Sequence, residues 1–253
     1  MKTVAFNWAP AFAVAAACAL ITAGQAQAAA AARPDFTGVW TNAGAPALGG
    51  TTNVAAPTPP IRPAVKVRVD AFNALINPTG ETAGQYCLGY GMPQSTLGSG
   101  GYPLEIIQRP EQITTISEAH TEVRHIYFGA RNAPEDERLP GRNGYSSGRW
   151  EGAVLVVETD NLVEQLDQRQ WPHSDEATIV ERYYLEPKPD AQGRRILVDE
   201  LTMTDPKFYT APVKATKRWA QIPNGRLLNY ECPEETWHIR LEALAKAKGV
   251  SLP

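Results

Sequence analysis

His173 is the residue whose type and surroundings point most directly to chemistry. It lies in residues 171–176, WPHSDE, at the end of a long connection that leads into a β-branched run. The β-branched and aromatic runs discussed below predict a β-barrel, and an imidazole at the mouth of such a barrel can act as a general acid–base, with Asp175 or Glu176 orienting it. The alternative is that His173 only stabilises its own loop by hydrogen bonding.

A catalytic use of His173 needs partners, which other segments of the sequence offer. Tyr145 or Arg131 would stabilise developing negative charge, and Glu118 or Glu181 would orient the substrate. The catalytic candidates are therefore His173, Tyr145 and Glu181. The candidate ligand-binding residues are arginine, glutamate and aromatic side chains of the same β-rich region: Arg124, Tyr127, Arg131, Trp150 and Glu118.

Metal and nucleotide sites are not expected. His120 and His125 are five positions apart, which puts them on opposite faces of a continuous strand. Gly89-x-Gly91 has no strand before it and no helix after it, so it is not a phosphate-binding loop. The sequence therefore predicts neither a metal nor a cofactor.

Composition restricts the class of protein. The chain has 253 residues, of which 43% are hydrophobic, with a net charge of −3 and a pI near 5.9. This charge provides no basic field to hold nucleic acid or an anionic membrane. With 21 prolines and 20 glycines, the sequence suits short strands joined by many turns.

The first segment indicates export. Lys2 is followed by an apolar stretch from Trp8 to Ala23, and residues 26–28 are the small-x-small pattern of a cleavage site. Residues 1–28 are thus predicted to be a signal peptide, giving a periplasmic or secreted protein with no integral membrane segment after cleavage. An uncleaved N-terminal anchor is the alternative.

Two cysteines remain after the predicted cleavage, Cys87 and Cys232. In an oxidising compartment they most simply form one disulfide. The alternative is two separate thiols too far apart to pair.

The remaining chain divides into three regions. Residues 29–104 are predicted to be an irregular, Pro/Gly-rich segment with one short helix near 64–76 and a lid-like loop over 84–103. Residues 105–232 show short β-branched and aromatic runs with turn signals between them. Residues 233–253 are predicted to form a C-terminal helix, packed on the outside of the sheet. The expected strands cover residues 105–109, 112–118, 122–128, 147–151, 154–159, 177–185, 195–203, 213–221 and 227–231.

The strands predict a barrel. Since no long helical pattern separates them, we expect hairpin connections, and eight or nine sequential strands avoid exposed edges by closing. The fold class is thus mostly β, an antiparallel up-and-down, lipocalin-like barrel. Alternation puts charge among apolar side chains on both strand faces, so Arg124, Glu118 and Glu181 are expected inside the barrel with Glu–Arg pairing. Structural ion pairing alone would explain the same pattern.

One segment carries a family resemblance. Residues 146–152, SSGRWEG, run into residues 155–159, LVVET, and together they resemble the signature of a widespread family of uncharacterised exported bacterial proteins. The chain departs from that family at residues 153–154, where Asp-Thr is usual, and at residues 133–134, where His-Pro is common. The resemblance implies an exported β-rich domain and no catalytic assignment.

Three functions follow from these features. The first is an exported protein that binds a small hydrophobic or aromatic molecule in the barrel cavity. The second is a cofactor-free lyase, isomerase or hydrolase that uses His173 as acid–base in the same cavity. The third is a purely structural envelope protein with a filled interior. The oligomeric state and the identity of the ligand are left open.

Overall fold

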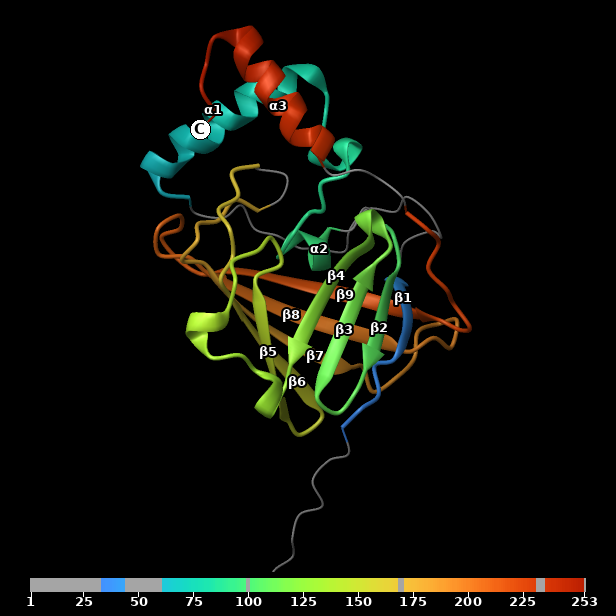
Figure 1. The fold of residues 1–253 in the computed structure, drawn as a ribbon. Coiled ribbons are helices and arrows are strands. Elements are labelled where there is room, and N and C mark those ends of the chain that lie inside the picture. Colours follow the sequence, from blue (N-terminus) through green and yellow to red (C-terminus); the bar gives the residue numbers. More distant parts are fainter. Residues whose placement is uncertain (1–32, 44–60, 99–100, 168–170, 231–234, 253) are drawn as a thin grey trace, which may run out of the picture. The chain divides into compact units, whose positions relative to one another are not determined.

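The computed structural model describes residues 33–43, 61–98, 101–167, 171–230 and 235–252. Within these ranges nine strands form one closed barrel (Figure 1). The strands are β1 (Gly38–Asn42), β2 (Leu104–Gln108), β3 (Gln112–Ser117), β4 (Glu122–Tyr127), β5 (Tyr145–Glu151), β6 (Val154–Asp160), β7 (Thr178–Leu185), β8 (Ile196–Thr204) and β9 (Val213–Ile222). The prediction of a mostly β protein with a closed barrel is therefore confirmed.

The barrel is not antiparallel throughout. Each strand pairs with its neighbours in sequence, β1 closes the ring against β9, and all pairs are antiparallel except the parallel pair β4–β5. Nine is an odd number, and a ring of strands alternating up and down closes without a parallel pair only when the number is even. The connection over 128–144 is long enough to return the chain to the end of the barrel where β4 began. The prediction of hairpins throughout is wrong at this position.

The strand that closes the ring comes from the segment expected to be irregular. β1 pairs with β2 and with β9, through the registers Trp40↔Leu104 and Trp40↔Gln221. The strand expected at 227–231 is absent from the described residues 227–230, although Asn224 and Gly225 do form a turn. The turn signal was correct, but β1 already occupies the edge of β9 that a hairpin partner would need.

Three α-helices accompany the barrel: α1 (Pro63–Ile76), α2 (Gln94–Leu97) and α3 (Glu235–Lys248). α1 begins with proline at its first turn, where the missing N–H costs no hydrogen bond, and it matches the predicted helix. α3 confirms the C-terminal helix and ends before Gly249, whose φ is +63°.

The buried stripe of α3 packs against other helices, whereas the sequence predicted that it would pack on the outside of the sheet. Trp237 and Leu241 belong to an apolar cluster with Leu75 and Ile76 of α1 and with Leu88 near the short 3₁₀ helix η2 (Ala83–Tyr86). Among the described residues, none of the strands contributes to this cluster. A helical stripe predicts that a face is buried, but it does not say which element covers it.

The barrel interior is arranged in three layers. On three strands a charged side chain lies between two apolar neighbours that belong to different clusters: Glu181 between Ile179 and Tyr183, Asp199 between Leu197 and Leu201, and Lys217 between Ala215 and Trp219. The cluster at one end includes Trp40, Ile113 and Leu155, and the cluster at the other end includes Met203 and Leu97 of α2. A belt of polar side chains therefore crosses the middle of an otherwise apolar interior.

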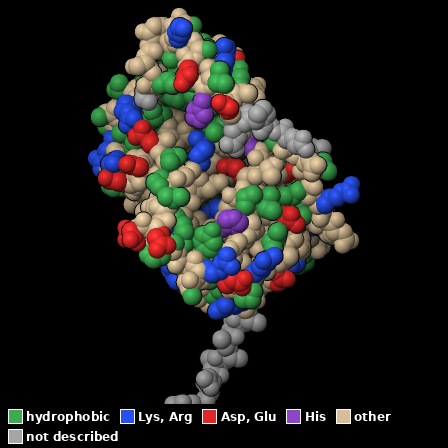
Figure 2. All heavy atoms as spheres, in the orientation of Figure 1, with side chains coloured by type: hydrophobic (Ala, Val, Ile, Leu, Met, Phe, Trp, Pro, Cys, Tyr) green, Lys and Arg blue, Asp and Glu red, His purple; other side chains and the backbone are tan. Residues whose placement is uncertain are grey.

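Several predictions concern residues outside the described ranges or at their border. The predicted signal peptide, residues 1–28, and Cys232 lie outside them. Cys87 is buried, and its predicted pairing with Cys232 stays a prediction. None of the described helices is long and apolar enough to span a membrane. Basic and acidic side chains are interspersed on the face shown in Figure 2.

Candidate functional site

The candidate site is the polar belt inside the barrel. Because strand side chains alternate, residues that pair in register point to the same side of the sheet. The register connects Asp199 with Lys217 and Tyr183, and Trp219 with Asn42. We call this belt the polar layer; its members are Asn42, Ser117, Arg124, Ser146, Thr159, Glu181, Tyr183, Asp199, Lys217 and the indole N–H of Trp219.

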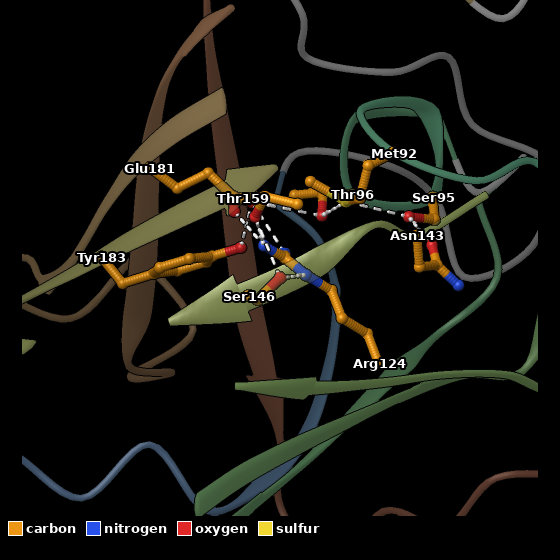
Figure 3. A network of polar contacts seen from close by, with 9 residues as sticks. All are labelled: Met92, Ser95, Thr96, Arg124, Asn143, Ser146, Thr159, Glu181 and Tyr183. Atoms are coloured by element: carbon orange, nitrogen blue, oxygen red, sulfur yellow. Dashed lines mark hydrogen bonds and ion pairs between the residues drawn. The ribbon is translucent and has the colours of Figure 1, made fainter. Parts of the chain in front are cut away.

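The half of the polar layer on β4–β7 is fully hydrogen-bonded (Figure 3). Arg124 donates two hydrogen bonds to the Glu181 carboxylate, and the nitrogen–oxygen distance of one of them is 3.0 Å. The same guanidinium donates to Ser146 Oγ at 2.9 Å and to Thr159 Oγ1 at 2.8 Å. Tyr183 donates its hydroxyl proton to Glu181 Oε1 at 2.7 Å.

This pairing sets the charge states of the β4–β7 half. Burial by itself would lower the pKa of Arg124, but the Glu181 carboxylate more than offsets it and the net shift is upward. Burial also raises the pKa of Tyr183 well above its usual range. The half thus holds one cation, one anion and a neutral phenol, all satisfied. The Glu–Arg pair expected inside the barrel is present.

The other half of the polar layer, on β8, β9 and β1, is largely without hydrogen bonds. Among the described residues, both oxygens of Asp199, both amide atoms of Asn42 and the indole nitrogen of Trp219 have no partner. All three side chains are 0% exposed. Buried polar groups are nearly always hydrogen-bonded, so three orphaned side chains on one wall are the unusual feature of this interior.

Lys217 is the charged residue of the β8–β1 half. It is fully buried, its ammonium lies 4.6 Å from the ring centroid of Trp219, and it donates to the Leu97 carbonyl at 3.2 Å. Burial lowers the pKa of Lys217 to about 8, although Asp199 opposes this shift. Burial and the nearby Glu181 carboxylate raise the pKa of Asp199 well above its usual range. Both groups are therefore shifted towards their neutral forms.

α2 closes the barrel above this layer. Besides the bond between Lys217 and Leu97, Thr96 Oγ1 lies 3.5 Å from Glu181 Oε1. At the rim, the Glu122 carboxylate accepts from the backbone of Tyr90 at 3.0 Å and of Gly91 at 2.7 Å. The segment expected to be a lid thus covers the interior and is anchored both at the rim and from within.

The closed interior leaves little space. A cavity of about 10 Å³, enough for one water molecule, is lined by Ser117, Arg124 and Tyr183 of the polar layer together with α2 and the rim. The Ser117 hydroxyl has no hydrogen-bond partner among the described residues, and the side chains of the β8–β1 half do not line this cavity. A ligand larger than water therefore enters this site only if α2 moves.

Arg124 and Glu181 are the two predicted site residues that the fold brings together. Trp150 shares their lumen face on β5 but lies in the apolar end layer, 5.5 Å from the ring of Phe36. Sequence reasoning therefore found one ion pair of the polar layer and one residue of the layer next to it.

The remaining predicted ligand-binding residues lie outside the polar layer. Tyr127 stacks on Tyr145 at 5.4 Å, and both belong to the outward face of their strands. Arg131 is exposed in a short 3₁₀ turn. Glu118 follows the end of β3 and accepts from the backbone N–H of Leu228 at 2.7 Å. The fold does not bring these residues together with Arg124 and Glu181, because strand parity puts Tyr127 and Tyr145 on the outward face and Arg131 and Glu118 lie beyond strand ends.

His173 is buried in the loop between β6 and β7. Its ring Nδ1 lies 2.7 Å from the Trp171 carbonyl, and its backbone pairs with Gln165. The neighbouring Ser174 is held by two hydrogen bonds to Asp205. Burial lowers the pKa of His173 below its ordinary value. These contacts match the alternative of a loop-stabilising histidine, and its catalytic role stays a prediction.

Sequence reasoning missed Asp199, Lys217, Asn42 and Trp219 as site residues. The signal for two of them was present: Asp199 alternates with Leu197 and Leu201, and Lys217 with Trp219. A lone charge on the apolar face of an alternating strand predicts a buried charge. Within the described ranges, no three His, Cys, Asp or Glu side chains gather closely enough to hold a metal ion.

In the comparisons with known proteins, no protein-family model and no curated protein matches the chain.

Proposed function

We propose that the protein binds a small molecule inside the barrel, in the polar layer beneath α2, as lipocalin-like barrels do. The supporting observation is the orphaned wall of Asn42, Asp199 and Trp219, three fully buried side chains whose polar side-chain atoms have no hydrogen-bond partner within the described ranges. Burying such groups unpaired costs about 1–3 kcal/mol each. A barrel with only a structural role would place apolar side chains there.

The apolar layers on either side define the rest of the ligand. Trp40, Leu197 and the ring of Trp219 lie on one side of the polar layer, and Leu97 and Leu201 on the other. A ligand that reaches the orphaned wall therefore buries its body against aliphatic and aromatic groups. We accordingly propose a small hydrophobic or aromatic molecule that also carries a hydrogen-bonding group.

Export and family complete the proposal. The apolar stretch from Trp8 to Ala23 and the cleavage pattern at 26–28 support a signal peptide and a periplasmic or secreted protein. The signature over 146–159 supports membership of the exported family that it resembles. N-terminal sequencing of the mature protein recovered from a periplasmic fraction tests the first point; the expected first residue is the one after Ala28.

Binding is tested with a neutral fluorophore, N-phenyl-1-naphthylamine, titrated into the purified mature protein. We expect saturable enhancement of the probe and quenching of the buried tryptophans Trp40 and Trp219. Leu97→Ala, which removes packing between α2 and the barrel, should raise the affinity several-fold by making opening easier. Leu139→Ala, at a position 83% exposed, is the matched control and should change nothing. Absence of saturable binding in all three proteins would overturn the proposal.

A further inference from the structure

In the proposed function the ligand takes the place of α2 inside the barrel, so the contacts that α2 makes there indicate the chemistry of the ligand. The Leu97 side chain packs in the apolar cluster at the α2 end of the barrel, and its carbonyl oxygen accepts a hydrogen bond from the Lys217 ammonium at 3.2 Å. Once α2 has moved, Lys217 is a fully buried cation that needs a new acceptor. An oxygen attached to an apolar body reproduces what Leu97 supplies.

The wall around Lys217 is rich in donors. The orphaned Trp219 indole N–H and the Asn42 amide N–H₂ lie on the same face as Lys217, on β9 and on the adjacent β1. Lys217 itself has three N–H bonds, of which one points to Leu97. Donor groups on these neighbouring strand positions fit a carboxylate, which has two oxygens and about four acceptor sites.

The charge of the polar layer leads to the same ligand class. Arg124 and Glu181 neutralise each other through their paired hydrogen bonds. Asp199 faces Lys217 in register, yet no ion pair joins them in the described part of the chain, and neither Asp199 oxygen accepts a hydrogen bond. Burial favours the protonated form of Asp199 by raising its pKa. In that form Asp199 is a further donor, and Lys217 is a cation without a counter-ion.

We infer that the ligand is a small carboxylic acid with an apolar or aromatic body, bound as its carboxylate against Lys217, Trp219 and Asn42. The inference rests on the proposed function, since it names the ligand class of the same site. The carboxylate replaces the Leu97 carbonyl on Lys217 and supplies the missing charge. The apolar body takes the place of the Leu97 side chain.

The test compares three ligands of one shape class, benzoate, benzamide and benzylamine, by calorimetry on the mature protein. Near pH 6.5 we expect benzoate to bind at least about tenfold more tightly than benzamide, because a charge-assisted pair with Lys217 is gained. Equal affinities, or a preference for benzamide or benzylamine, would overturn the inference. A preference for benzylamine would show instead that an ionised Asp199 selects the ligand.

Two variants on β9 locate the preference. Lys217→Met should abolish the advantage of benzoate over benzamide, so that the ratio of the two affinities falls to about one. Lys214→Met is the matched control: Lys214 lies on the same strand but on its exposed face, so the advantage should persist. Persistence of the advantage in Lys217→Met would place the carboxylate elsewhere and overturn the inference.

A pH arm needs no variant. Asp199 on β8 pairs with Lys217 in register, and the other titratable groups of the polar layer are Glu181 and Tyr183 on β7 and Arg124 on β4. Its pKa of about 8 means that the ammonium is lost as the pH rises. Benzoate affinity should therefore fall about tenfold between about pH 7 and about pH 9.5, and benzamide affinity should stay level. Parallel pH profiles for the two ligands would contradict the assignment.

The outcomes separate the two proposals. Saturable binding of the neutral fluorophore or of benzamide inside the barrel, with no preference for benzoate, overturns the carboxylate inference and leaves the proposed function standing. Failure of the fluorophore and of all three benzene derivatives to bind overturns both.

Discussion

The two halves of the polar layer consist of similar residue types but differ in their hydrogen bonding and ion pairing. On β4–β7, Arg124 and Glu181 bind each other, and Ser146 and Thr159 complete the donors of the guanidinium. On β8–β1, Asp199 faces Lys217 across one register position, but no ion pair joins them among the described residues. The first half is a fully hydrogen-bonded network, and the second is the half in which we propose that a ligand binds.

The largest expected loss in the free energy of unfolding comes from replacing the Glu181 carboxylate by an amide of the same shape. Glu181→Gln leaves the Arg124 cation buried without its counter-ion, so the free energy of unfolding should fall by about 3–5 kcal/mol. Urea unfolding at about pH 7 measures it. Arg149→Met, which removes an exposed ion pair with Glu158, is the control and should cost at most about 1 kcal/mol. A loss under 1 kcal/mol in Glu181→Gln would show that the two halves do not differ.

The second prediction concerns the alkaline stability of the protein. The pKa of Lys217 is about 8 in the folded state, below its ordinary value of 10.5. The folded state therefore binds fewer protons than the unfolded state between these values, and the Lys217 contribution to the free energy of unfolding rises with pH across this window. The full change is about 3 kcal/mol.

Lys217→Met should remove this rise, whereas Lys214→Met on the exposed face of β9 should keep it. Urea titrations at several pH values between 7 and 10.5 measure the slope. The same slope in Lys217→Met and in the unmodified protein would mean that another group titrates.

Replacing His173, which lies outside the polar layer, should have an intermediate effect on the free energy of unfolding. Its ring fills a buried position and lies 2.7 Å from the Trp171 carbonyl. His173→Ala should therefore lower the free energy of unfolding by about 1–3 kcal/mol while ligand affinity stays unchanged. Thermal unfolding and fluorophore titration of the same samples measure both quantities. Intact stability with lost binding or catalysis would restore His173 as a functional residue.

The smallest change in the free energy of unfolding is expected for Asp199→Asn. Asp199 accepts no hydrogen bond from the part of the chain that the structure describes, so an amide loses none, and the amide carries no charge to bury. Because the folded-state pKa of Asp199 is raised, its contribution to stability is lost as the pH rises above about 4. The variant should thus be within about 1 kcal/mol of the unmodified protein at neutral pH, or slightly more stable. A loss as large as that of Glu181→Gln would show an ionised Asp199 that neutralises Lys217.

Local patterns predicted the elements better than their connections. The alternating runs from residue 105 to residue 222 gave eight strands close to their observed bounds, and Pro63 with the apolar spacing of 64–76 gave α1. β1 was missed because a five-residue run beside a Pro/Gly-rich stretch carries little local signal. Its strand conformation depends on two partners, β2 and β9, that lie far away in the sequence.

The candidate site was predicted in part for a related reason. Periodicity assigns Arg124 and Tyr127 to opposite faces of one strand, but only closure of the barrel decides which face is the interior. The sequence could name Arg124 and Glu181 as a pair because both lie on runs with apolar neighbours. It could not show that Thr96 and Leu97 reach them, since α2 is four residues long and has no amphipathic pattern.

The sequence by itself determined that this protein is β-rich, that it ends in a helix, and that charged side chains occupy apolar strand faces. These features depend on residues within a few positions of one another, where propensity and alternation act directly. Only the tertiary structure decided that β4 and β5 run parallel, that Asp199 lies opposite Lys217, and that α2 covers them. These features depend on how a ring of nine strands closes, which no local pattern encodes.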